Sequence, residues 1–96
     1  MNAEQQSSLQ GIQKQKKELV WQCRRGIKEI EILLIPFLEN DFEKADAQTR
    51  ERFVRLLAQA DLDIFEWFNG RSKPEDQDME SIINVILSRV ATRNQA

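Results

Sequence analysis

The chain has 96 residues, of which 41% are hydrophobic and 31% are charged, and its formal net charge is −2. This size and composition are typical of one globular domain with a single small core, and the charge gives no general attraction to nucleic acid or to an anionic membrane. The sequence has no histidine and one cysteine, Cys23. It therefore excludes the usual zinc sites, the histidine-dependent nucleophile pairs and an internal disulfide bond.

The cysteine and the N-terminal residues bear on the cell compartment. A lone cysteine fits a reducing compartment. Residues 1–8 lack an Arg-rich amphipathic pattern, and no apolar segment of a signal peptide follows them. The longest apolar run, Ile32–Leu38, contains Pro36 and is too short to span a bilayer. We therefore expect a cytoplasmic protein that does not insert into a membrane.

The first predicted helix follows a flexible N-terminal tail, residues 1–11. Gly11 favours a start near Ile12, and apolar residues then recur at a helical period. The positions expected to face inward include Ile12, Leu19, Val20 and Cys23. Cys23 is thus expected to be a small buried residue, with a reactive thiol as the alternative. The lysines of this segment are expected to form a solvated basic face: Lys14, Lys16 and Lys17.

The stretch from Arg24 to Glu29 holds the only paired arginines, followed by Gly26. The charge changes sign here, because residues 1–28 hold six Lys/Arg and two Glu, whereas residues 29–46 hold six Asp/Glu and one Lys. Cations favour a helix C-terminus, anions favour an N-terminus, and glycine readily adopts the left-handed cap conformation. We therefore predict a corner at Gly26. The alternative is one continuous helix in which Arg25 and Glu29 form an i,i+4 ion pair.

The second helix is predicted over residues 27–42 and the third after an N-cap at Asp46. The second is apolar nearly all round, which is typical of a central helix. Its main inward stripe is Ile27, Ile30, Leu34, Phe37 and Leu38. The third helix is predicted to bury Phe53, Leu56, Leu57 and Ala60.

A short fourth helix is predicted to begin at an Asp61 cap, to bury Phe65 and Phe68, and to stop at Asn69-Gly70. Trp67 lies off that stripe and is either a core residue or part of an interface. The last helix is predicted to begin at Pro74 or Asp76. It has the clearest helical periodicity of the chain: Met79, Ile82, Ile83, Ile86, Leu87 and Val90.

No stretch alternates with the period of a strand. The sequence therefore predicts an all-α fold, a compact five-helix bundle. The predicted domain covers residues 12–93, between the tail 1–11 and a C-terminal tail, 94–96.

A resemblance to a known family adds to these predictions. Trp21-Gln22-Cys23-Arg24-Arg25-Gly26-Ile27-Lys28-Glu29 resembles the R-G-x-x-E signature of the succinate dehydrogenase flavinylation factors, often seen as W-x-C-R-R-G-x-x-E. The resemblance continues in order through four further stretches: residues 35–39, 53–57, 61–67 and 73–74. This chain has Leu62 where the family often has proline after the aspartate.

The resemblance implies an assembly factor that is not itself an enzyme. Family members bind the flavoprotein subunit of succinate dehydrogenase, and in some bacteria that of fumarate reductase, and promote covalent attachment of FAD to a histidine of that partner. The implied cofactor, FAD, is carried by the partner. We expect no cofactor or metal bound by this chain, no catalytic residue, no nucleic-acid partner, and a monomer when free.

The resemblance also implies which residues bind the partner: Arg24, Arg25, Gly26, Lys28, Glu29 and Trp67. Gly26 lets the partner's backbone approach closely, and Arg25 offers fork-like hydrogen bonds to a carboxylate or to carbonyls. Glu29 orients Arg25 or accepts from the partner, and Trp67 is a candidate aromatic anchor. The competing functional class is another binding module, such as an antitoxin or a small adaptor.

Overall fold

The structure is a computed structural model that describes residues 3–94, with side chains described over residues 10–90. Within this part of the chain it contains five α-helices and no strand. The helices are α1 (Ala3–Gln22), α2 (Lys28–Asn40), α3 (Ala47–Leu57), α4 (Asp61–Phe68) and α5 (Gln77–Asn94). The predicted all-α, five-helix fold is confirmed.

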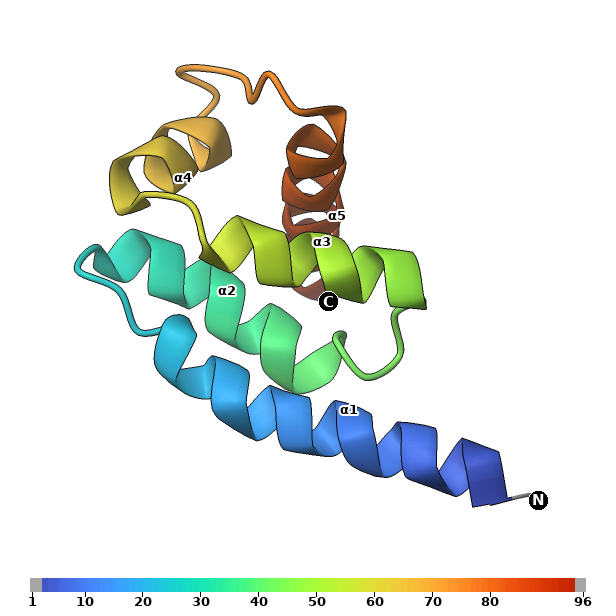
Figure 1. Cartoon of the computed structure of the whole chain (residues 1–96). Coiled ribbons are helices and arrows are strands. Elements are labelled where there is room, and N and C mark those ends of the chain that lie inside the picture. The colour runs from blue at the N-terminus through green and yellow to red at the C-terminus, as the bar shows by residue number, and fades with distance from the viewer. Residues whose placement is uncertain (1–2, 95–96) are drawn as a thin grey trace.

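The second helix lies in the middle of the arrangement. In Figure 1, α1 runs along one side of α2 and α3 lies on the other side. The helix contacts agree with this view, because α2 packs against α1, α4 and α5, and the rings of Phe37 on α2 and Phe53 on α3 have centroids 5.0 Å apart. The corner between α1 and α2 lies at the same end of the molecule as α4. The central position predicted for this helix is confirmed.

The core is formed by apolar side chains from all five helices and the two turns beside α2. Its fully buried members include the predicted stripe on α5, and Leu87 and Val90 complete that stripe as half-buried residues. The buried core residues are Leu19, Cys23, Ile30, Leu34, Phe37, Leu38, Phe42, Phe53, Leu56, Leu57, Ile64, Met79, Ile82, Ile83 and Ile86. Burial of this set is the main stabilising contribution to the fold.

Several helix boundaries differ from the prediction. α1 begins at Ala3 rather than near Ile12, so Gly11 lies inside a helix, a position that glycine tolerates at a modest cost. α2 ends at Asn40, and Phe42 reaches the core from the following turn. The division into tails and one domain stays a prediction. Most of the C-terminal tail, 94–96, lies outside the described residues.

Two side chains predicted to face inward are exposed. Val20 is 39% exposed because it lies to one side of the Leu19–Cys23 line that packs on the core. Ala60 is exposed because it is the extended N-cap residue of α4 and not the last inward position of α3. By contrast, Asp46 caps α3 as predicted, since its side chain accepts a hydrogen bond from the Thr49 N–H.

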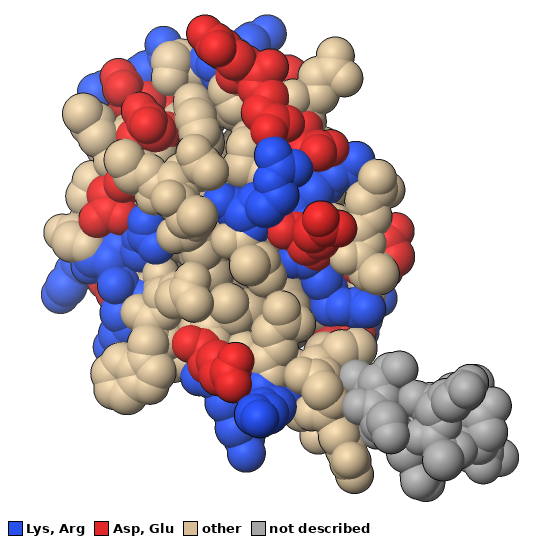
Figure 2. Space-filling view, viewed as in Figure 1, with Lys and Arg blue, Asp and Glu red and all other residues tan. Residues whose placement is uncertain are grey.

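The surface carries both signs of charge. Figure 2 shows Lys/Arg and Asp/Glu side chains interspersed on one face of the molecule, around an uncharged area. Among the described residues, no helix is both long enough and apolar enough to cross a membrane.

Candidate protein-binding site at the corner between α1 and α2

The corner is a short loop, residues 23–27, which we call the motif loop. Its first residue, Cys23, is fully buried, and its last, Ile27, is half-buried in an extended conformation before α2. The Cys23 N–H still bonds back to the Leu19 carbonyl at 3.0 Å, so the chain leaves the helix only at Arg24. Apolar contacts thus fix both ends of the loop, while Arg24 and Gly26 are exposed between them.

Arg25 directs its guanidinium into the molecule. Its Nε donates to Asp61 Oδ1 at 2.6 Å, and its Nη1 donates to the carbonyls of Gln22 at 2.9 Å and Leu57 at 2.8 Å. Its Nη2 donates to the Gln59 carbonyl at 2.7 Å. The side chain is only 13% exposed. Arg25 therefore joins the end of α1 to the end of α3 and the start of α4.

Asp61 completes this arrangement from the other side. Its Oδ1 accepts from Arg25, and its Oδ2 accepts from the Gly26 N–H at 3.1 Å. These hydrogen bonds, from Arg25 first and Gly26 second, lower the pKa of the Asp61 carboxyl below its usual range. The prediction that Asp61 caps α4 is wrong: the N-cap residue is Ala60, which makes no side-chain capping bond. The Asp61 carboxylate instead accepts hydrogen bonds from the motif loop.

The Arg25 backbone is also held. Its N–H donates to Glu31 Oε1 at 3.1 Å, so two successive N–H groups of the loop, those of Arg25 and Gly26, bond to carboxylates of α2 and α4. The predicted left-handed conformation at Gly26 is wrong, because among the described residues only Gly70 has a positive φ, 71°. The predicted corner at Gly26 is present, but it is held by hydrogen bonds that the loop N–H groups donate to carboxylates of other helices. The continuous helix with an Arg25–Glu29 pair is excluded.

Cys23 is a structural residue. Its side chain is fully buried, and burial raises the pKa of the thiol from 9.0 to about 11, while the nearby Arg25 charge lowers it slightly. The thiol is thus protonated at neutral pH, and thiolate, not thiol, is the nucleophile. The prediction of a small buried core residue is confirmed, and the reactive thiol is not supported.

The charged side chains that remain exposed at the corner are Arg24, Lys28 and Glu29. Within the described residues, the structure records no ion pair for any of them. They surround Gly26, where an added Cβ would meet only Asp61 Oδ2, at 3.5 Å. The corner therefore presents an open backbone flanked by two cations and one anion, supported from within by Arg25 and Asp61.

The two tryptophans occupy different environments. Trp67 is half-buried and packs against the core, which gives it a structural contact. Trp21 is 77% exposed, in the last turn of α1 directly before the motif loop. Sequence reasoning did not select Trp21 as a site residue. Its exposure could have been predicted, because Leu19 and Cys23 face inward and Trp21, midway between them in the chain, lies on the opposite side of the helix.

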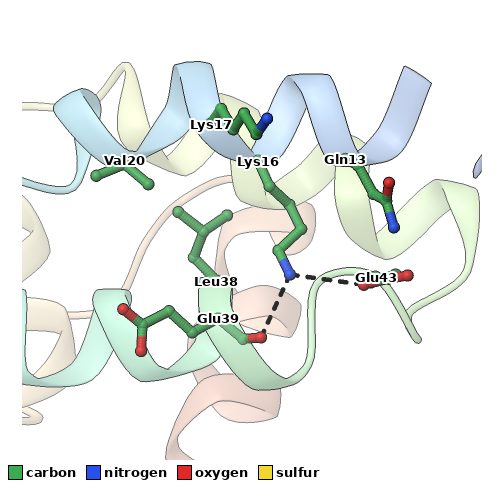
Figure 3. Close-up of a pocket in the computed structure, with 7 residues that line it drawn as sticks. All are labelled: Gln13, Lys16, Lys17, Val20, Leu38, Glu39 and Glu43. Carbon is green, nitrogen blue, oxygen red and sulfur yellow. Dashed lines mark hydrogen bonds and ion pairs between the residues drawn. The ribbon is translucent and has the colours of Figure 1, made fainter. Parts of the chain in front are cut away.

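A hollow of about 400 Å³ lies between α1 and the end of α2 (Figure 3). The Lys16 ammonium extends into it and contacts the Glu39 carbonyl at 3.3 Å and Glu43 Oε2 at 3.6 Å. Lys16 thus tethers α1 to the turn after α2, and is not part of a purely solvated basic face. The described residues contain no group of three or more His, Cys, Asp or Glu side chains suited to hold a metal ion.

Taken together, the fold and the corner define a small helical protein with an exposed, internally supported loop suited to binding another protein. The sequence model of the family described as "Flavinator of succinate dehydrogenase" matches residues 17–90, which include the motif loop and parts of all five helices. The chain belongs to this family.

Curated relatives agree with this assignment. The chain is similar to the "FAD assembly factor SdhE" of Pseudomonas aeruginosa, with 42% identity over 74 residues, 77% of this chain and 88% of the relative. It is 38% identical to the protein of that name from Idiomarina loihiensis over 77 residues, 80% of this chain and 86% of the relative. The one from Pectobacterium atrosepticum is 35% identical over 74 residues, 77% of this chain and 84% of the relative.

Proposed function

We propose that this protein is an assembly factor that binds the flavoprotein subunit of succinate dehydrogenase and promotes covalent attachment of FAD to it. The observation that carries the proposal is the family match, which extends over residues 17–90 and contains the motif loop. The relatives named as FAD assembly factors support it, because they match over most of their own length.

Within this proposal the corner residues have two kinds of role. Arg24, Lys28 and Glu29 are exposed and have no ion-pair partner among the described residues, so they are available to the flavoprotein. Gly26 is exposed and carries no side chain, so the partner's backbone can approach it closely. Arg25 is assigned a positioning role rather than the direct contact implied by the resemblance, because four of its side-chain hydrogen bonds are made within the chain.

The chemistry of attachment belongs to the flavoprotein and its FAD. We assign no catalytic residue to this chain, and we propose that FAD is carried by the partner. The contribution of this chain is to favour a conformation of the flavoprotein in which attachment is fast. Service to fumarate reductase, a monomeric free state, a cytoplasmic location and partner binding by Trp67 stay predictions.

The alternative, an antitoxin or another small adaptor, is less well supported. The family description and the names of the relatives both concern flavin assembly. No comparable observation favours a toxin as the partner.

Deletion of the gene tests the proposed function. Covalent flavin on the dehydrogenase subunits is measured by in-gel fluorescence in the deletion strain, with and without a plasmid copy. The proposal predicts loss of the fluorescent flavoprotein band and its return with the wild-type copy. A fluorescent band of unchanged intensity in the deletion strain contradicts the proposal.

A further inference from the structure

Four large apolar side chains are exposed on the described surface, and all of them belong to helices that adjoin or contact the motif loop. Over the residues with described side chains, the exposed members of this class are Val20, Trp21, Ile32 and Leu62. The last three have exposed fractions of 77%, 67% and 62%, in chain order. Single exposed apolar residues are common on protein surfaces, but a group of them rimmed by polar residues marks an interaction site.

These three residues come from three different helices, each of which adjoins the motif loop in the chain or contacts it through a side chain. Trp21 is in the last turn of α1, immediately before the loop. Ile32 is four residues after Lys28 on α2, and this spacing places the two on the same side of the helix. Leu62 follows Asp61, whose carboxylate holds Arg25 and Gly26 of the loop. The motif loop is thus the element that connects or contacts all three helices.

The surface beside Ile32 is concave. A shallow and almost wholly apolar hollow of about 380 Å³ lies along the outer side of α2, lined by Lys28, Glu31, Ile32, Ile35 and Pro36. Lys28 belongs to the motif, so the hollow continues the charged corner along α2. A partner that covers Gly26 and Lys28 also reaches this apolar surface. Val20 is different, because it lines the separate hollow that Lys16 enters.

We propose that Trp21, Ile32 and Leu62 are the anchor residues by which the chain binds the flavoprotein subunit, with the motif loop between them. The inference rests on the proposed function and deepens it by naming the residues that supply affinity. Binding energy in protein interfaces is concentrated in a few apolar or aromatic side chains, among which tryptophan is over-represented. Charged side chains at such a surface contribute more to orientation and specificity than to affinity.

The two groups of residues therefore affect different measurements. Loss of an anchor weakens binding but leaves the motif loop able to act once the complex forms. Loss of a motif charge leaves most of the affinity and impairs FAD attachment within the complex. Because the anchors are exposed, replacing them also leaves the fold intact, unlike the replacement of core residues.

The test measures the dissociation constant between the purified chain and the flavoprotein subunit that has not yet received covalent FAD. We expect Trp21→Ala to raise the Kd about 30-fold, and Ile32→Ser and Leu62→Ser to raise it about fivefold or more. Asn84→Ala, at an exposed position on α5, is the matched control and should keep the wild-type Kd. All variants should keep the wild-type melting temperature. At saturating concentration, the anchor variants should support FAD attachment at the wild-type rate.

The outcomes separate this inference from the proposed function. If the wild-type chain does not bind the flavoprotein, the proposed function itself fails. If the wild-type chain binds and the folded anchor variants bind equally well, only the anchor assignment is overturned. If sedimentation instead shows that Trp21→Ala dissociates a wild-type homodimer without changing the Kd for the flavoprotein, the anchors belong to a self-interface and the inference is also overturned.

Discussion

The motif loop and the junction between α3 and α5 each contain an arginine paired with aspartate, yet the two sites are built differently. Arg25 is 13% exposed and bonds to three backbone carbonyls in addition to Asp61. Arg55 is 45% exposed and bonds to two carboxylates, those of Asp76 and Asp78. Exposed ion pairs contribute little to stability, whereas a shielded donor that satisfies several carbonyls is costly to remove. The comparison indicates that Arg25 fixes the conformation of the motif loop, whereas Arg55 forms surface ion pairs that contribute little to stability.

The largest expected effect is that of Arg25→Ala. The substitution removes the Arg25 donors of the Leu57 and Gln59 carbonyls and of Asp61 Oδ1. At about 1 kcal/mol net for each hydrogen bond, we expect the free energy of unfolding to fall by about 2–4 kcal/mol. Urea denaturation measures this change. Arg55→Ala is the matched control and should have a clearly smaller effect, so equal effects of the two substitutions refute the distinction drawn here.

A second measurement on Arg25→Ala follows the loop itself. Cys23 is fully buried, with a thiol pKa of about 11, and should react very slowly with a thiol reagent at pH 8 in the wild-type protein. If Arg25 holds the loop closed, Arg25→Ala speeds the reaction under conditions in which the protein stays folded. Arg25→Lys should restore part of the protection, because lysine keeps the charge but not the fork of donors.

The two exposed glycines of the interhelical loops, Gly26 and Gly70, differ in backbone conformation, and we expect a smaller difference in stability from replacing them. Gly70 has a φ of 71°, so Gly70→Ala forces a side chain into the left-handed region at a cost of about 1–2 kcal/mol. Gly26 has no positive φ, and an added Cβ would make an ordinary contact of 3.5 Å. Gly26→Ala should therefore change the melting temperature less than Gly70→Ala. The reverse order contradicts the conformation of the motif loop described above.

The smallest expected effect is a dependence on acid pH. Hydrogen bonds from Arg25 and Gly26 lower the pKa of Asp61 in the folded state. The stability that this provides is thus present above the unfolded carboxyl pKa, about 3.9, and is lost as the pH falls through the lower folded value. The Gly26 amide resonance reports the change directly, because its N–H donates to Asp61. It should shift with pH below about 4 in the wild-type protein and not in Asp61→Asn.

The sequence predicted those features that depend on local periodicity. The stripes on α2 and α5 identified Ile30, Leu34, Ile82 and Ile86 as buried, and the position of Asp46 before an apolar run identified a helix cap. Local sequence also predicted that Asp61 caps a helix, and this prediction was wrong. The Asp61 carboxylate instead accepts a hydrogen bond from Arg25, 36 positions away in the chain. A contact between residues so far apart produces no periodic pattern in the sequence, so it could not be predicted from periodicity.

Burial of the two tryptophans depends on which side of each helix faces the core. Trp67 lies off the stripe predicted from Phe65 and Phe68, but the fully buried residue of α4 is Ile64, three positions earlier, so Trp67 meets the core on that side of the helix. The exposure of Trp21 was accessible from the spacing of Leu19 and Cys23, since these residues define the inward side of α1. The prediction of a left-handed conformation at Gly26 was wrong because the N–H groups of Arg25 and Gly26 donate to carboxylates of α2 and α4, and these hydrogen bonds turn the chain there.

The central claim is that the exposed charges at the corner, Arg24, Lys28 and Glu29, act on the flavoprotein and do not hold the fold. The most direct test is the rate of covalent FAD attachment to the purified flavoprotein subunit in the presence of FAD and saturating Glu29→Gln. Glu51→Gln, an exposed glutamate on α3, is the control. We expect both variants to melt like the wild type, Glu51→Gln to support the wild-type rate, and Glu29→Gln to be about tenfold slower or more, through loss of a charge-assisted hydrogen bond to the partner. A folded Glu29→Gln that supports the wild-type rate contradicts the claim.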